Sequence, residues 1–172
     1  MKRIYLLIVL LFVTSFSIAQ APQSLSPQPT STEPAVFKAQ LMAHNLPVSG
    51  LTEVAFDSVF VNTANAYDKK TGYYIAPFAG WYYFHVQLIW YTADKPSTVG
   101  FKIIKNSNSN EDVESWTEIS STMQGAAFTS TSALMNLMVG DTVKVRANAA
   151  YGGNTTIGGY VGDSHFFGYK VY

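Results

Sequence analysis

The sequence predicts an all-β sandwich, and three observations support this fold class. From Ala35 onward, short runs rich in Val, Ile, Thr, Tyr and Phe alternate with Gly, Asn, Asp and Pro at about ten-residue intervals, which is typical of sandwiches. No stretch shows the periodicity of an amphipathic helix. The length from Ala35 to Tyr172 is that of one ordinary domain. We therefore expect residues 35–172 to form one β domain of about ten strands.

The strands follow from the apolar runs, and the turns follow from the residues between them. We expect strands near residues 35–43, 58–62, 66–68, 73–76, 80–91, 98–105, 114–120, 126–137, 141–149 and 165–172. Residues 68–72 and 139–141 have turn chemistry, and Gly72 and Gly140 are expected there at positive φ. Longer loops are expected at residues 93–99, 106–113 and 151–164.

The N-terminal segment has the composition of a secretory signal peptide. Two positive charges precede an apolar run over residues 4–13, and the small residues Ser17 and Ala19 follow it. A membrane anchor is the alternative, but the run is about ten residues long, whereas a spanning helix needs roughly 20. We expect residues 1–19 to be removed, which leaves no membrane anchor. The mature protein would be secreted, or periplasmic or at the cell surface in a bacterium.

Residues 20–34 are expected to form a Pro/Ser/Gln-rich linker. They hold four of the seven prolines and too little apolar surface to offset the entropy of ordering. The chain has no Cys, so no disulfide stabilises it. Loss of the signal leaves nine basic and eleven acidic residues, a net charge near −2. This balance gives no electrostatic basis for binding nucleic acid.

Two predicted strands are apolar on both faces, which a half-exposed strand would not be. In residues 80–91 one face holds Tyr82, Phe84, Val86, Leu88 and Trp90, and the other holds Trp81, Tyr83, His85, Gln87 and Ile89. In the last strand Phe167, Tyr169 and Val171 lie opposite Phe166, Gly168 and Tyr172. A covering loop or third layer explains the second apolar face, and so does contact with another subunit.

The sequence contains little that could support catalysis. Its three histidines, His44, His85 and His165, have no metal-binding spacing, and there is no nucleophile elbow or phosphate loop. Asp141 is expected to be a turn carboxylate. The acidic loop of Glu111, Asp112 and Glu114 is either solvated or a calcium site, because carboxylates and nearby Asn side chains suit that ion. We expect no catalytic residue, no metal and no cofactor.

Residues 151–162 form the most unusual local composition, with five glycines in twelve residues. Tyr, Gly, Ser and Asn are favoured in recognition loops, so Tyr151, Asn154 and Tyr160 are the candidate ligand-binding residues. The alternative is a plain connection between the last two strands. The sequence Asn154-Thr155-Thr156 is also a glycosylation sequon, which matters only in a eukaryote.

A series of short motifs runs through the predicted domain in a fixed order. The motifs are Val36-Phe37-Lys38-Ala39, Phe56-Asp57, Val61-Asn62, Tyr67-Asp68, Thr71-Gly72, Ala76-Pro77, Gly80-Trp81-Tyr82-Tyr83-Phe84, Lys105-Asn106, Leu137-Met138-Val139-Gly140-Asp141 and Phe166-Phe167-Gly168-Tyr169. This series resembles the globular head domain of complement component 1q, which has a tumour necrosis factor-like jelly roll. The resemblance implies a jelly-roll sandwich that associates as a compact homotrimer through one sheet. It implies a trimer interface formed by Trp81, Tyr83, Ile89, Phe167 and Tyr169.

The chain departs from these relatives in two respects. It has no Gly-X-Y collagen repeat, so it would be a stalkless member. Several relatives bind calcium near the threefold axis, but the matching residues 123–127 contain no carboxylate, and Glu118 is the nearest acid. We therefore expect a secreted, non-enzymatic binding protein, a homotrimer whose loops engage a polysaccharide or cell envelope. A structural or adhesive protein without a specific ligand is the alternative, and a secreted hydrolase is a third hypothesis.

Overall fold

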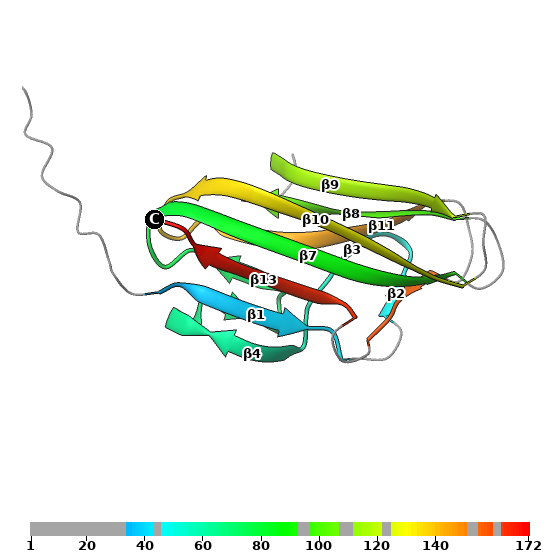
Figure 1. Cartoon of the computed structure of the whole chain (residues 1–172), viewed down its shortest axis with the longest axis horizontal. Coiled ribbons are helices and arrows are strands. Elements are labelled where there is room, and N and C mark those ends of the chain that lie inside the picture. The colour runs from blue at the N-terminus through cyan, green and yellow to red at the C-terminus, as the bar shows by residue number, and fades with distance from the viewer. Residues whose placement is uncertain are drawn as a thin grey trace, which may run out of the picture. The chain divides into compact units, whose positions relative to one another are not determined.

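The computed structural model describes residues 34–42, 46–92, 97–106, 112–121, 125–150, 155–159 and 163–172 (Figure 1). These residues form strands β1 (Val36–Gln40), β2 (Leu46–Val48), β3 (Gly50–Glu53), β4 (Ser58–Asn62), β5 (Tyr67–Asp68), β6 (Tyr73–Ile75), β7 (Gly80–Thr92), β8 (Ser97–Lys105), β9 (Asp112–Ser121), β10 (Gly125–Leu137), β11 (Thr142–Ala150), β12 (Thr155–Ile157) and β13 (His165–Lys170). A short 3-10 turn, η1 (Thr63–Asn65), follows β4. The expected signal peptide and nearly all of the expected linker lie outside the described residues.

The strands form two antiparallel sheets that pack as a sandwich. Sheet A has the order β2-β12-β7-β13-β1-β4, and β10 pairs with β7. Sheet B has the order β5-β6-β11-β8-β9, and β3 pairs with β11. The first strand, β1, pairs with the last, β13, and Figure 1 shows β13 between β1 and β7. Most neighbouring strands are therefore distant in sequence, and the predicted jelly-roll sandwich is confirmed.

The core between the sheets is a cluster of aromatic rings. Phe37 of β1 stacks on Tyr74 of β6 at 4.8 Å between ring centroids, and meets the edge of Phe166 at 4.7 Å. On β7 the predicted inward set is fully buried: Tyr82, Phe84, Val86, Leu88 and Trp90 are all 0% exposed. Burial of each such side chain contributes about 1.5–3 kcal/mol to folding. The alternation of β7 therefore places one face in the core, as the sequence predicted.

All ten predicted strands are present, but three short ones were not predicted. β2 contains Pro47, which removes a ladder donor, and β2 lies at the edge of sheet A, where a strand tolerates this loss. β12 forms inside the glycine-rich stretch that was expected to be a loop. It pairs with Trp90–Thr92 of β7 and with β2. Pairing with partners distant in sequence, rather than local propensity, creates these strands.

Local chemistry sets the turns as expected. Gly72 and Gly140 have φ of 76° and 88°, a region that glycine enters without a steric penalty. Asp141 accepts a 2.8 Å hydrogen bond from the backbone N–H of Met138 and one of 2.7 Å from the Asn106 amide. The Lys105-Asn106 and Gly140-Asp141 motifs are thus brought together, where they fasten the ends of β8 and β11. In the described ranges, no helix has the length and apolarity needed to cross a membrane.

Candidate functional site

The outward side of sheet A carries a cluster of aromatic rings at its centre. We call it the aromatic face, and it comprises Trp81, Tyr83, His85, His165, Phe167 and Tyr169. The ring centroids of Tyr83 and Tyr169 lie 5.5 Å apart, and those of His85 and Phe167 lie 5.2 Å apart. These contacts follow from the register, which places Tyr83 opposite Tyr169 and His85 opposite Phe167. Four of the five residues expected at a subunit interface therefore lie on one surface, along β7 and β13.

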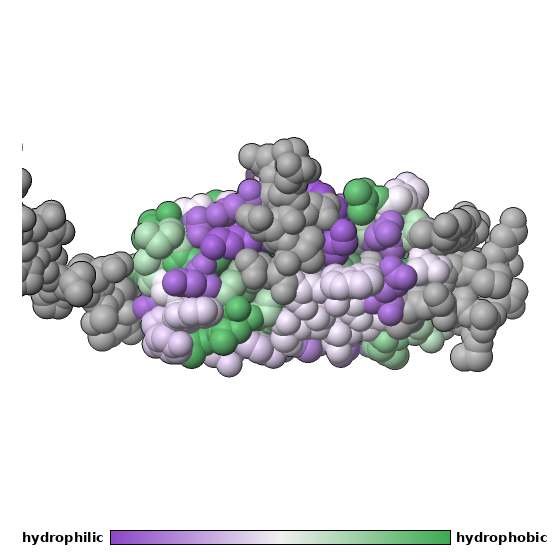
Figure 2. All heavy atoms as spheres, turned by 90° about the horizontal axis from the view of Figure 1, so that it is seen from above, coloured by the Kyte–Doolittle hydropathy of each residue, from purple (hydrophilic) through white to green (hydrophobic). Residues whose placement is uncertain are grey.

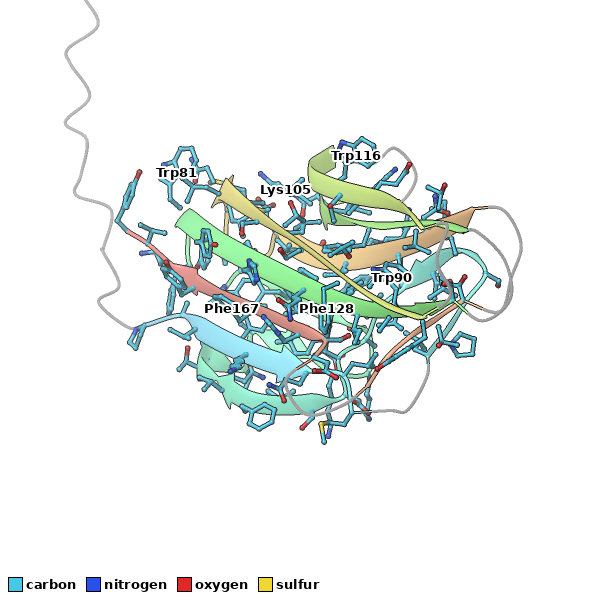
Figure 3. All side chains as sticks on the ribbon, turned by 45° about the vertical axis from the view of Figure 1, so that its right-hand side comes forward. Trp81, Trp90, Lys105, Trp116, Phe128 and Phe167 are labelled. Atoms are coloured by element: carbon cyan, nitrogen blue, oxygen red, sulfur yellow. The ribbon has the colours of Figure 1, made fainter. Side chains whose placement is uncertain are left out.

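These side chains are only partly buried within their own chain. Trp81 and Tyr169 are 37% and 42% exposed, and Tyr83 and Phe167 are half-buried. Figure 3 shows Phe167 beside β13 and Trp81 near the start of β7. Contiguous apolar surface of more than a few hundred Å² is uncommon on monomeric proteins. The aromatic face therefore has the character of a contact surface, and no third layer covers it within the described ranges.

Ile89 differs from the other four residues, and this corrects the expectation from the sequence. It is only 4% exposed, because Gly158 and Ser164 of the same chain pack against it. The backbone N–H of Gly158 donates to the Ile89 carbonyl at 2.9 Å, and the Ile89 N–H donates to the Ser164 hydroxyl at 3.0 Å. A Cβ at Gly158 would lie 2.8 Å from Ile89 Cγ2, so glycine permits this close approach. Ile89 is thus unavailable to another subunit.

The polar groups on the aromatic face find partners within the chain. Ser132 of β10 lies 2.9 Å from both the Tyr83 hydroxyl and His85 Nδ1. Gln87 donates to the Asp163 carbonyl at 3.1 Å. Partial burial, followed by repulsion from His165, lowers the pKa of His85 below its usual value. The face can therefore be covered without leaving these groups unpaired, and it favours neutral His85.

β10 adds exposed apolar residues that the sequence analysis missed. Leu134 lies opposite Tyr83 and is 56% exposed, and Phe128 lies opposite Ile89 and is 58% exposed. The other face of β10 is buried at Ala133, Met135 and Leu137. Strand alternation over residues 126–137 could have identified Phe128 and Leu134, because the other residues on their face are small or polar. The apolar outer surface of sheet A thus extends from β13 across β7 to β10.

A second group of exposed apolar residues lies at one end of the sandwich. Met138, Val139 and Tyr172 are more than half exposed, beside the β10–β11 turn and the C-terminus. Apolar side chains are visible at this end, on the left of Figure 2. The backbone N–H of Trp81 donates to the Tyr172 carbonyl at 3.0 Å, which ties the C-terminus to the start of β7. This end is therefore continuous with the aromatic face.

The candidate ligand-binding residues Tyr151, Asn154 and Tyr160 lie outside the described residues. Residues 155–159, between Asn154 and Tyr160, are firmly held: Thr155 and Ile157 are buried in β12, and the Ser164 hydroxyl donates to the Gly158 carbonyl at 2.8 Å. The three candidates thus flank an anchored segment rather than one uninterrupted loop.

The catalytic and metal candidates have structural roles where the structure describes them. The Met138 N–H first, and then Asn106 and Lys105, lower the pKa of Asp141, as expected for a turn carboxylate. The rings of His85 and His165 lie 5.6 Å apart. No group of three or more His, Cys, Asp or Glu side chains able to hold a metal occurs in the described part of the chain. The expected absence of cofactors stays a prediction, because Glu111 of the acidic loop lies outside the described residues, whereas Asp112 and Glu114 lie in β9.

The C1q domain family model matches residues 36–171, almost the whole described domain. The chain belongs to the C1q domain family. C1q and tumour necrosis factor-like domains are typically extracellular recognition domains that form trimers and bind ligands. A search of curated proteins finds no match to this chain.

Solved structures support the same fold. Murine APRIL at pH 5.0 superposes with a TM-score of 0.64 at 13% identity, over 81% of this chain and 100% of that one. Eiger TNF from S. frugiperda gives a TM-score of 0.62 at 14% identity, over 81% of this chain and 92% of the other. The globular domain of zebrafish complement 1qA gives 0.58 at 17% identity, over 80% and 98%. At these identities the likeness establishes the jelly-roll fold alone.

Proposed function

We propose that this C1q domain protein is a secreted, non-enzymatic recognition protein that acts as a homotrimer. The observation that carries the proposal is the aromatic face, because partly exposed Tyr83, Phe167 and Tyr169 lie at the centre of a sheet whose other side already forms the core. Membership of a family that typically forms trimers supports the same assembly.

The arrangement of apolar residues favours a head-to-tail contact. The surface near β10, with Phe128 and Leu134, is continuous with the aromatic face but lies on one side of it. In a head-to-tail ring, each subunit packs one apolar patch against a different patch of its neighbour. We propose that β10 of one subunit covers the β7–β13 rings of the next. Three such contacts would close the ring and bury both patches.

Recognition is proposed to come from the segments that flank β12. Binding residues concentrate in connections held by a rigid scaffold, and β12 supplies such an anchor beside Tyr151, Asn154 and Tyr160. Three copies on one trimer would strengthen weak contacts if the ligand repeats at matching spacing. A polysaccharide or cell envelope has this repetitive character, which a small soluble metabolite lacks.

The first experiment measures assembly of the mature chain beginning at Gln20. Light scattering coupled to gel filtration should give about three times the chain mass. Tyr83→Asp should give a folded monomer, because it places an unpaired charge in a desolvated contact. Ile75→Asp is the matched control, since Ile75 is 47% exposed on sheet B, and this variant should remain trimeric. A wild-type monomer at micromolar concentration would refute the assembly.

The second experiment tests the ligand-contacting residues. The combined variant Tyr151→Ala, Asn154→Ala and Tyr160→Ala leaves β12 and the Gly158–Ile89 contact intact, which a loop deletion would not. We expect it to remain trimeric but to lose binding to immobilised polysaccharides or envelope fragments. Equal binding by the variant would remove these residues from the site. A wild-type trimer that binds no repetitive surface would favour the structural or adhesive alternative.

A further inference from the structure

The outward side of sheet B contains a small hollow, distant from the aromatic face. Its volume is about 200 Å³, and its lining includes Gly100 and Lys102 of β8, Trp116 and Glu118 of β9, and Asn148 of β11. The register places Gly100 directly between Glu118 and Asn148. Lys102 lies opposite Trp116 in the next row. These residues therefore form a shallow site across three paired strands.

Gly100 creates the floor of this hollow. A Cβ at this position would lie 2.4 Å from the Thr117 carbonyl oxygen and 3.1 Å from Glu118 Cα, which are backbone atoms of the neighbouring strand. No side chain fits there without a shift of β9. Glycine inside a strand often marks a place where a ligand or another backbone approaches closely. The flat floor is thus a consequence of the strand pairing.

Trp116 is the tryptophan whose position the fold does not explain. Trp90 is 0% exposed and donates a 2.7 Å hydrogen bond to Thr129, and Trp81 belongs to the aromatic face. Trp116 is 60% exposed on edge strand β9. Figure 3 shows it beyond β9, well separated from Phe167 and Phe128. A large exposed ring beside a hollow gains nothing from the core, and it offers a flat apolar surface to a ligand.

Two polar side chains of the hollow, those of Glu118 and Asn148, are available to a ligand. The Glu118 carboxylate and the Asn148 amide make no hydrogen bond to any described residue. One accepts hydrogen bonds and the other both donates and accepts. Lys102 and Glu118 contribute opposite charges to the lining, so the hollow as a whole has no net charge. It matches a neutral ligand that carries hydroxyl groups around an apolar ring.

The neighbouring row of charges makes the site rigid. Glu53 accepts hydrogen bonds from Lys144 at 2.6 Å and from Arg146 at 3.1 Å, and Tyr73 accepts one from Lys144 at 3.1 Å. Arg146 lies opposite Lys102 in the register. The cross-strand network fixes the strands beside the hollow before any ligand arrives. Such preorganisation reduces the entropy lost on binding.

We propose that this hollow binds one neutral pyranose unit of a polysaccharide. The C–H face of the sugar would stack on the electron-rich face of Trp116. Its hydroxyl groups would bond to Glu118 and Asn148. The volume is below the roughly 300 Å³ at which pockets for drug-sized ligands begin, which suits a single ring. The proposal extends the recognition role above to a second surface, on the sheet opposite the proposed subunit contact.

Soluble oligosaccharides test the site independently of avidity. Maltotriose, mannotriose and a galactose disaccharide are titrated against the mature protein by calorimetry, with a hyaluronan tetrasaccharide as the acidic comparison. We expect at least one neutral probe to bind. Trp116→Ala should weaken it about tenfold or more, and Trp116→Tyr, which keeps a flat ring, should retain most of the affinity. Ile75→Ala, on the same side of sheet B, should bind as wild type does.

Three outcomes would overturn the proposal. In the first, no neutral probe binds. In the second, only the hyaluronan probe binds, and in the third, Trp116→Ala binds the neutral probe as tightly as wild type does. A fourth is dissociation of the trimer by Trp116→Ala, which would assign Trp116 to the subunit contact. The combined Tyr151, Asn154 and Tyr160 variant separates the two proposed surfaces. If that variant loses the soluble probes and Trp116→Ala keeps them, the recognition role stands and the hollow is refuted.

Discussion

The two sheets of the sandwich present different outer surfaces. On sheet A, Tyr83, Phe167 and Tyr169 form a partly exposed aromatic layer. On sheet B, Lys144 and Arg146 share the carboxylate of Glu53, and Lys144 lies over the Tyr73 ring at 4.9 Å. Both sheets contribute their inner faces to the same core. The core therefore does not require the aromatic layer, and this difference favours the proposed subunit contact on sheet A rather than on sheet B.

The largest effect is expected from alanine substitution at Phe166, compared with the same substitution at Phe167. The two residues are adjacent on β13 but lie on opposite faces. Phe166 is fully buried, so Phe166→Ala should lower the free energy of unfolding by about 3–5 kcal/mol. Phe167→Ala should cost the single chain less and instead weaken the trimer. Urea denaturation and light scattering measure the two effects. If both variants lose the same free energy of unfolding and both remain trimeric, Phe167 does not belong to a subunit contact.

The next prediction concerns the effect of acid on assembly. Burial lowers the pKa of His85 in the folded chain, so the neutral form is favoured there. The stability that the folded chain has with neutral His85 is fully present above the unfolded pKa of 6.5. It is lost as the pH falls through the lowered pKa of the folded chain. His85 faces Ser132 on β10 and His165 and Phe167 on β13. We expect the trimer to dissociate more readily at pH 5 than at pH 7.5.

His85→Gln is the variant that tests this assignment. It removes the titrating group but retains a polar side chain opposite Ser132, so the dissociation should shift to lower pH. Sedimentation velocity across the pH series measures the change. If the variant and the wild type dissociate at the same pH, His85 does not control the acid response.

The smallest effect is expected on sheet B. Burial opposes ionisation of Glu53, but hydrogen bonds from Lys144 and Arg146 outweigh it, and the pKa of Glu53 is lowered. Its stabilising contribution is present above the unfolded pKa of 4.5 and is lost as the pH falls through the folded value. Solvent reaches Glu53, whose side chain is 42% exposed, and screens its interaction with the nearly buried Lys144, so Glu53→Gln should cost only about 1 kcal/mol and leave the trimer intact. Dissociation of this variant would contradict the solvent-facing role of sheet B.

Features that depend on near neighbours in the chain could be predicted from the sequence. Alternation at period two assigned Tyr82 to one face of β7 and Tyr83 to the other, because successive side chains on a strand point in opposite directions. Gly72 and Gly140 marked their turns because few other residues adopt positive φ there without strain. The ordered motifs indicated the family. The conclusion that β7 and β13 needed cover on both sides came from these same local patterns.

Features that depend on residues distant in the chain became visible only in the fold. Ile89 has the alternation of an interface residue, yet Gly158 and Ser164, far along the chain, cover it. β12 exists because β7 and β2 supply its partners. The hollow at Gly100 needs the register of β8, β9 and β11, which sets Trp116, Glu118 and Asn148 around it. Which remote segments pair, and which of them cover a face, depends on the whole chain, so the pattern within one strand does not predict it.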